Sequence, residues 1–171
     1  MFKAIKWIIR LVVLVALVIG AGYVYFVFLN PGQTLTEVQK ETIATLGRPA
    51  QFSISYLPQD SDEGGQLVRQ EVWFYPSQKQ KLVFLSGQLI ATEDLEVPDN
   101  VEYAATMLKS EDFDFYTTLA DVEKMVGKLN LAEVDMPGFF DEQESGLRTY
   151  AAKQGAFIFE QGYLTYMETL D

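Results

Sequence analysis

The sequence predicts an α+β protein: a single N-terminal transmembrane helix followed by two tandem repeats, each a helix with antiparallel sheet. An apolar run near the start of the 171-residue chain carries no charge. Two later segments, 82–94 and 157–169, share one hydrophobic pattern around a glycine, and each is preceded by residues with helical apolar spacing. We therefore divide the chain into 1–30 (cytoplasmic tip and membrane helix), 31–97 (first repeat) and 98–171 (second repeat).

The first predicted element is a membrane helix over Trp7–Leu29. At ~1.5 Å per residue, these 23 residues are long enough to cross a hydrocarbon core of ~30 Å. No charged residue occurs between Leu11 and Thr36. The run is longer than the apolar part of a signal peptide and no A-x-A-like site follows it, so we interpret it as an uncleaved anchor rather than a cleaved signal.

Charge sets the orientation of this helix, because cations stay on the cytoplasmic side. Three cations precede it: Lys3, Lys6 and Arg10. The N-terminus is therefore predicted inside and the rest of the chain outside. A patch of small residues offers a packing surface for another membrane helix, although glycine and alanine are also frequent in membrane helices generally: Ala16, Gly20, Ala21 and Gly22.

Composition excludes several classes of function. Beyond the predicted anchor, ten Lys and Arg face all 24 Asp and Glu, a net charge of −14 that repels nucleic acid. The chain has no cysteine, so the domain must be held by its core rather than by disulfides. It has no histidine, which rules out Ser-His-Asp and Cys-His catalysis and a His-based zinc site. We predict no catalytic residue, no cofactor and no small-molecule substrate.

The two similar segments predict two β-hairpins. Aligned at an offset of 75, Phe84 falls on Phe159 and Gly87 falls on Gly162. In each copy an apolar run leads into x-Gly and a second run, which is typical of a two-residue turn where glycine supplies a positive φ. The alternative is a chance match between two amphipathic hairpins.

Helix signals precede both hairpins. The segment 34–41 resembles 118–125, and each begins with a capping-box pattern, Thr34 with Glu37 and Thr118 with Asp121. Gly47 and Pro49 should end the first helix and Asn130 the second. Alternating strands are expected next, over 52–56 and 132–136, and a further helix is expected over 99–109.

Several short motifs resemble those of the BamE/SmpA family, small envelope lipoproteins of the outer-membrane barrel-assembly machine. They are Gly32-x-Thr34-x-x-x-Val38, Leu46-Gly47-x-Pro49, Trp73-Phe74-Tyr75 and Phe84-x-x-Gly87-x-Leu89. Two such units in tandem resemble the β-lactamase inhibitor protein fold. The second unit departs from the pattern, with Leu129-Asn130-Leu131-Ala132 in place of L-G-x-P. The chain also lacks the lipidated cysteine, so outer-membrane location does not carry over.

The resemblance implies a non-catalytic protein-binding module. With the predicted anchor, it implies a single-pass bacterial inner-membrane protein with a periplasmic C-terminal domain. The expected role is an accessory or scaffold subunit of an envelope complex, with a membrane-protein complex in the same membrane as its partner. The alternative is a membrane-tethered inhibitor or ligand-binding protein acting on a soluble periplasmic enzyme.

Aromatic residues among acids in two predicted loops are the candidate protein interface. They are Phe113, Phe115 and Tyr116, and Phe139 and Phe140. Aromatic side chains are enriched at the centres of protein interfaces. The alternative is that these rings pack under the sheet.

One segment, Asp60–Glu71, partly matches a calcium-binding EF-hand loop, with acids at the first, third and twelfth positions. Gly64 and Val68 supply no side-chain oxygen at two other ligand positions, and the flanks are not helical. We therefore predict a solvated hairpin loop and no metal site. The same holds for the carboxylate pairs Asp112/Asp114 and Glu142/Glu144, which we expect to be solvated rather than catalytic.

Overall fold

The computed structural model describes residue 15 and residues 34–59, 66–98, 103–131 and 147–169. The chain forms two compact units, Met1–Gly32 and Gln33–Asp171. All the strands and the helices named below belong to the second unit.

The predicted membrane helix and its small-residue patch lie outside the described residues, apart from Val15. Ala16, Gly20, Ala21 and Gly22 are all in the part that is not described. Within the described ranges, no helix combines the length and the apolar character needed to span a membrane. The prediction of a single-pass inner-membrane protein is corrected accordingly: the described fold does not support it.

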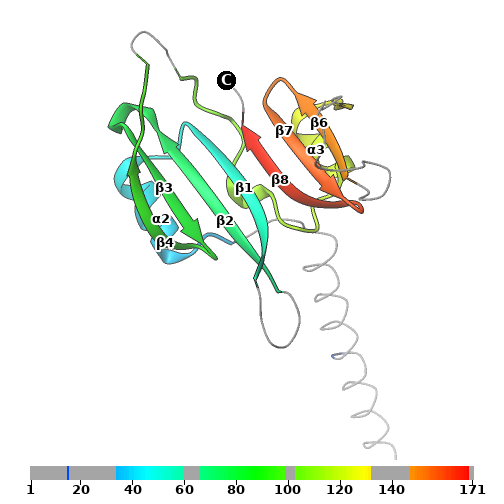
Figure 1. The fold of residues 1–171 in the computed structure, drawn as a ribbon, viewed down its shortest axis with the longest axis horizontal. Coiled ribbons are helices and arrows are strands. Elements are labelled where there is room, and N and C mark those ends of the chain that lie inside the picture. Colours follow the sequence, from blue (N-terminus) through cyan, green and yellow to red (C-terminus); the bar gives the residue numbers. More distant parts are fainter. Residues whose placement is uncertain (1–14, 16–33, 60–65, 99–102, 132–146, 170–171) are drawn as a thin grey trace, which may run out of the picture. The chain divides into compact units, whose positions relative to one another are not determined.

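The described strands form one continuous antiparallel sheet of eight, in the order β4-β3-β2-β1-β8-β7-β6-β5 (Figure 1). Their bounds are β1 Gln51–Gln59, β2 Gln66–Tyr75, β3 Gln80–Leu85, β4 Gln88–Asp94, β5 Asn130–Leu131, β6 Leu147–Ala152, β7 Gly155–Glu160 and β8 Tyr163–Thr169. The two halves join where Ser53–Ser55 of β1 pairs with Tyr166–Glu168 of β8.

The predicted fold class is therefore wrong. The described residues form a single eight-stranded sheet with two α-helices, not a transmembrane helix followed by two helix-plus-sheet repeats. The physical reason is the pairing of β1 with β8, which joins segments more than a hundred residues apart. A pairing at that separation leaves no mark on local hydrophobic patterns, which report only the period of each element.

Both helices lie behind the sheet in Figure 1, α2 (Glu37–Leu46) behind β3 and β4, and α3 (Leu119–Val126) behind β6 and β7. The capping box of α3, Thr118 with Asp121, confirms the prediction. That of α2 is Thr36 with Gln39, so the predicted pair Thr34 and Glu37 is wrong by two residues.

The helix ends are only partly as predicted. Gly47 ends α2 as expected, whereas Gly127, and not Asn130, ends α3. Two short 3-10 turns complete the described helical structure, Pro76–Gln78 and Ser110–Asp112. Residues 103–109 form no helix, against the prediction for 99–109, and the predicted strand at 132–136 lies outside the described residues.

Both predicted hairpins are confirmed. Ser86 and Gly87 have φ of 48° and 75°, and Gln161 and Gly162 have φ of 50° and 89°, as a two-residue turn of type I′ requires. Each hairpin also has a register shift at the same place, between Val83 and Phe84 in β3 and between Ile158 and Phe159 in β7.

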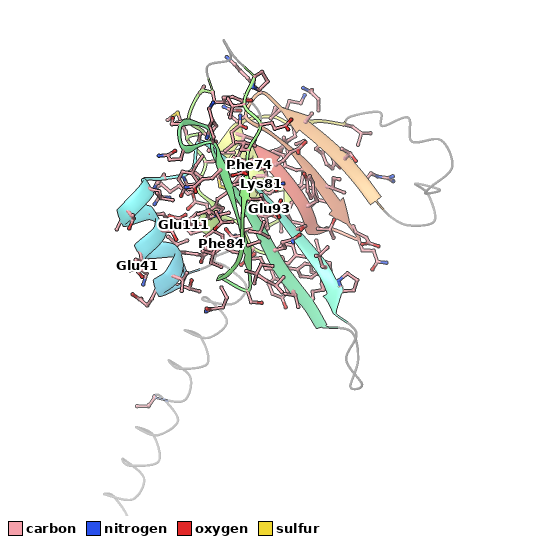
Figure 2. The ribbon with its side chains drawn as sticks, turned by 60° about the vertical axis from the view of Figure 1, so that its left-hand side comes forward. Glu41, Phe74, Lys81, Phe84, Glu93 and Glu111 are labelled. Carbon is pink, nitrogen blue, oxygen red and sulfur yellow. The ribbon has the colours of Figure 1, made fainter. Side chains whose placement is uncertain are left out.

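The core lies between the helices and one face of the sheet. Strand side chains that face the helices fill it, and in β8 the register shift changes which residues these are: Phe52, Ile54, Trp73, Tyr75, Leu82, Phe84, Phe157, Phe159, Leu164 and Met167. Strand side chains that face away from the helices form the opposite face. There Phe74, Lys81 and Glu93 follow one another across β2, β3 and β4 (Figure 2), and Lys81 Nζ lies 2.9 Å from Glu93 Oε2.

Candidate functional site

A groove lined by aromatic side chains opens where the ends of β1 and β2 approach the turn between β7 and β8. Its volume is about 330 Å³ and its lining residues are Tyr56, Pro58, Leu67, Phe115, Glu160, Gln161, Tyr163 and Thr165. The rings of Phe115 and Tyr163 stack with centroids 4.8 Å apart and an interplanar angle of 4°. Tyr56 meets Phe115 edge to face at 5.5 Å. We call this set, together with Tyr116, the aromatic groove.

Tyr116 extends the ring cluster to the surface. Its ring lies edge to face against Tyr163 at 6.1 Å and against Phe115 at 5.6 Å. Tyr116 is 50% exposed, Tyr163 44% and Leu67 44%. Large apolar side chains that gather at a surface mark interaction sites more often than scattered ones do.

Hydrogen bonds fix the loop that carries Phe115 and Tyr116. The Asp114 carboxylate accepts from the Tyr116 backbone N–H at 2.8 Å, and the Thr117 hydroxyl accepts from the Asp114 N–H at 2.8 Å. Short polar side chains form turns in this way. The Leu164 N–H of β8 donates to the Phe115 carbonyl at 3.2 Å. The loop is thus tied both to itself and to the sheet.

A buried ion pair supports the aromatic groove from the core side. Arg69 Nε donates to Glu71 Oε1 at 2.9 Å, and the two side chains are only 6% and 2% exposed. The guanidinium also donates to the Tyr56 hydroxyl at 2.9 Å, to the Ser110 carbonyl at 2.7 Å and to the Phe113 carbonyl. Arg69 therefore binds the hydroxyl of one groove residue, Tyr56. It also binds backbone carbonyls of the segment that precedes Phe115.

Glu71 connects the same network to α2 and to the core. Its carboxylate accepts from Gln39 Nε2 and from Trp73 Nε1, each at 2.9 Å. No buried side-chain nitrogen or oxygen in the described part of the chain lacks a hydrogen-bond partner. A buried charge pair persists only when its remaining donors and acceptors are also satisfied, and here they are. The network is a structural one.

The protonation states of the network follow from these contacts. Burial alone would raise the pKa of Glu71, but the charge and hydrogen bonds of Arg69, aided by Trp73, hold that pKa below its ordinary value of 4.5. Burial raises the pKa of Tyr56 to about 12, against the opposing effect of Arg69. At neutral pH the pair is therefore ionised and the Tyr56 hydroxyl is neutral.

This shift predicts a pH-dependent stability. Because the pKa of Glu71 is lower in the folded state, its contribution is fully present above pH 4.5 and is lost as pH falls through the folded-state pKa. Urea unfolding between about pH 3 and about pH 7 should show a steeper acid loss in the wild type than in Glu71→Gln. Parallel curves for the two proteins would contradict this. Glu37→Gln, at the exposed ion pair with Lys40, is the matched surface control.

The structure separates the predicted interface residues. Phe115 and Tyr116 come together in the aromatic groove. Phe113 is fully buried, packed against Phe52 and Phe157, so it belongs to the core and not to a surface. The other two, Phe139 and Phe140, lie outside the described residues.

Two aromatic residues of the groove, Tyr56 and Tyr163, are not among the predicted interface residues. The sequence places Tyr56 only at the end of the alternating strand expected over 52–56. Tyr163 is the equivalent of Gln88 in the first hairpin, because Tyr163 pairs with Glu160 as Gln88 pairs with Leu85. The sequence signal for Tyr163 is an aromatic residue at a position where the first hairpin has a polar one.

The last residue of the segment that partly matches a calcium-binding loop is already bound by other side chains. Glu71, its twelfth position, has its carboxylate bound by Arg69, Gln39 and Trp73. The flanks are strands β1 and β2 rather than helices, and 60–65 lie outside the described residues. Among the described residues no three His, Cys, Asp or Glu side chains gather where they could hold a metal ion. The Asp114 carboxylate accepts a hydrogen bond from the Thr117 hydroxyl within the turn that precedes Thr117. Glu142 and Glu144 lie outside the described residues.

Comparison of the chain with models of protein families, with curated proteins and with solved structures finds no match. The resemblance to the BamE/SmpA family therefore remains a prediction from short motifs.

Proposed function

We propose that the protein is a non-catalytic protein-binding module whose aromatic groove contacts a basic, partly apolar segment of its partner. In this role it acts as an accessory or scaffold subunit of a larger protein complex. The observation that carries the proposal is the stacked pair Phe115 and Tyr163, continued to the surface by Tyr116. Tyrosine is among the residues that dominate binding energy at protein interfaces.

Charge favours a basic partner. Glu160 is the charged side chain among the described residues that line the groove. From residue 31 onward the chain carries ten cations against 24 carboxylates. A cationic segment is attracted by this field, and its Lys or Arg side chains can also lie over tyrosine faces. The association should therefore weaken as salt is added.

Pre-organisation supports the same role. Tyr56 is held by Arg69, and the Phe115 loop is held by Asp114 and by the backbone of β8. Side chains already fixed in place lose little further freedom when a partner binds, and this raises affinity. Among the described residues that line the groove, no acidic side chain lies beside a basic one. Proton-transfer catalysis needs such groups within reach of a substrate.

A displayed library of random peptides, selected on the full chain, tests the proposal. We expect enriched peptides that combine Lys or Arg with apolar residues. Their affinity should fall by at least about 30-fold in the double variant Tyr116→Ser/Tyr163→Ser, because even one hot-spot side chain is worth about 2 kcal/mol.

The control is Met107→Ser, which removes a 93% exposed apolar side chain away from the groove and should leave affinity unchanged. Peptides that bind the double variant as well as the wild type would show that the aromatic groove is not the contact surface.

A further inference from the structure

The two hairpins, β3–β4 and β7–β8, correspond residue by residue. They have the same two-residue turn and the same register shift. Beyond the shift, Thr92 of β4 pairs with Leu82 as Met167 of β8 pairs with Phe157. Glu93 and Glu168 occupy the next equivalent position. The neighbour of β8 on its outer edge therefore indicates which kind of strand could pair with the outer edge of β4.

The outer edge of β8 is occupied. Strand β1 pairs with it antiparallel over Tyr166–Glu168, and the Leu164 N–H donates to the Phe115 carbonyl. The outer edge of β4 is different, because β4 ends the sheet within the described part of the chain (Figure 1). Leu89 and Ile90 on this edge are 42% and 56% exposed. An open strand edge is a template for pairing with another chain.

Among the described residues, no strand fills beside β4 the space that β1 fills beside β8. Ile54 of β1 lies opposite Met167 and is fully buried. At the equivalent place next to Thr92 there is a groove of about 460 Å³ between α2 and β4. Its lining includes the apolar residues Val38, Leu46, Leu82 and Leu89, with Glu41 among the polar ones. One apolar side chain from an added strand would enter it.

We propose that the outer edge of β4 at Ala91–Glu93 docks an extended segment of another protein, paired antiparallel, with an apolar residue opposite Thr92 and basic residues beside it. Main-chain hydrogen bonds would supply affinity and the groove would select the apolar side chain, as in other strand-addition complexes. This surface is separate from the aromatic groove, so the inference stands apart from the proposed function.

Charge argues for a basic segment. Glu41 of α2 lines the groove, and Glu93 of β4 is 51% exposed on the other face of the strand, where it also pairs with Lys81 (Figure 2). Asp94 follows on the same strand. A second copy of this chain would bring one acidic strand edge to another, which the repulsion between like charges disfavours. The register shift and these charges also limit unselective pairing, as protected edges do.

Strand β1 supplies the probe. In its pairing with β8, Ser53 lies opposite Glu168, so a peptide of residues 51–57 with Ser53→Lys would place lysine opposite Glu93. Full-length protein labelled with ¹⁵N is titrated with this peptide and with its Ser53→Glu counterpart. Amide exchange is followed at Leu89–Glu93, where Leu89 is the equivalent of Leu164.

We expect the lysine peptide to slow exchange at Leu89–Glu93 and to bind about two- to fivefold more tightly than the glutamate peptide, the range typical of one cross-strand charge pair. Glu93→Lys should reverse that order. Leu131→Ser, on β5 at the opposite end of the sheet, should change neither affinity. Unchanged exchange at β4, equal affinities for the two peptides, or protection that grows with protein concentration without peptide would each overturn the proposal, the last because it would indicate self-association.

Discussion

Replacing Arg69 with methionine should lower the free energy of unfolding by about 3–5 kcal/mol, because it leaves the Glu71 carboxylate buried without its counter-charge. Arg69 and Glu71 are only 6% and 2% exposed. The change also removes donors from the Tyr56 hydroxyl and from the carbonyls of Ser110 and Phe113. Urea unfolding at neutral pH measures the loss, and the double variant Arg69→Met/Glu71→Leu should recover part of it.

Arg48→Met is the matched control for this prediction. Arg48 makes two hydrogen bonds to Glu111, at 2.7 and 3.2 Å, but the pair is at the surface, with side chains 47% and 20% exposed. Solvated pairs contribute about 1 kcal/mol or less. If Arg48→Met and Arg69→Met destabilise the protein equally, the buried network does not have the role assigned to it here.

Gly87→Ala should lower the free energy of unfolding by about 3 kcal/mol, combining strain at positive φ with a lost helix cap. Gly87 has φ of +75°, and an added Cβ would collide with the Thr36 side chain. Thr36 is the N-cap of α2, and its hydroxyl donates to the Gly87 carbonyl at 2.6 Å. The substitution therefore strains the turn and displaces the start of the helix at once. Thermal or urea unfolding gives the value.

The second hairpin supplies the control. Gly162 occupies the same turn position with φ of +89°, but nothing lies within 4 Å of an added Cβ. Gly162→Ala should therefore show the backbone strain alone, about 1–2 kcal/mol. The difference between the two variants isolates the contact between the turn and α2. Equal losses would contradict that contact.

Elements set by neighbouring residues could be predicted from the sequence. Both hairpin turns follow from glycine and its neighbours, and the cap of α3 follows from Thr118 and Asp121. The cap of α2 could not be chosen in this way, because Thr34 with Glu37 and Thr36 with Gln39 match the same pattern. Tertiary contacts decide between them: Gln39 bonds to Glu71 and Thr36 bonds to the Gly87 carbonyl.

The candidate site could also be predicted only in part from the sequence. Phe115 and Tyr116 were predicted from an aromatic loop among acids, but Phe113, two residues before Phe115, is in the core. Composition alone does not tell which ring of such a loop turns inward. Tyr56 and Tyr163 join the groove only because β1 and β8 are neighbours in the sheet, and that pairing spans most of the domain.

Photo-crosslinking in the producing cells is the most direct test that the aromatic groove is the partner interface. A benzophenone amino acid is placed at Tyr163 or Tyr116 of the full chain and, as controls, at the exposed positions Met107 and Leu131, 93% and 60% accessible. We expect one discrete protein adduct at both groove positions, none at the controls, and less adduct as salt rises. Adducts of equal yield at groove and control positions, or none at the groove, would contradict it.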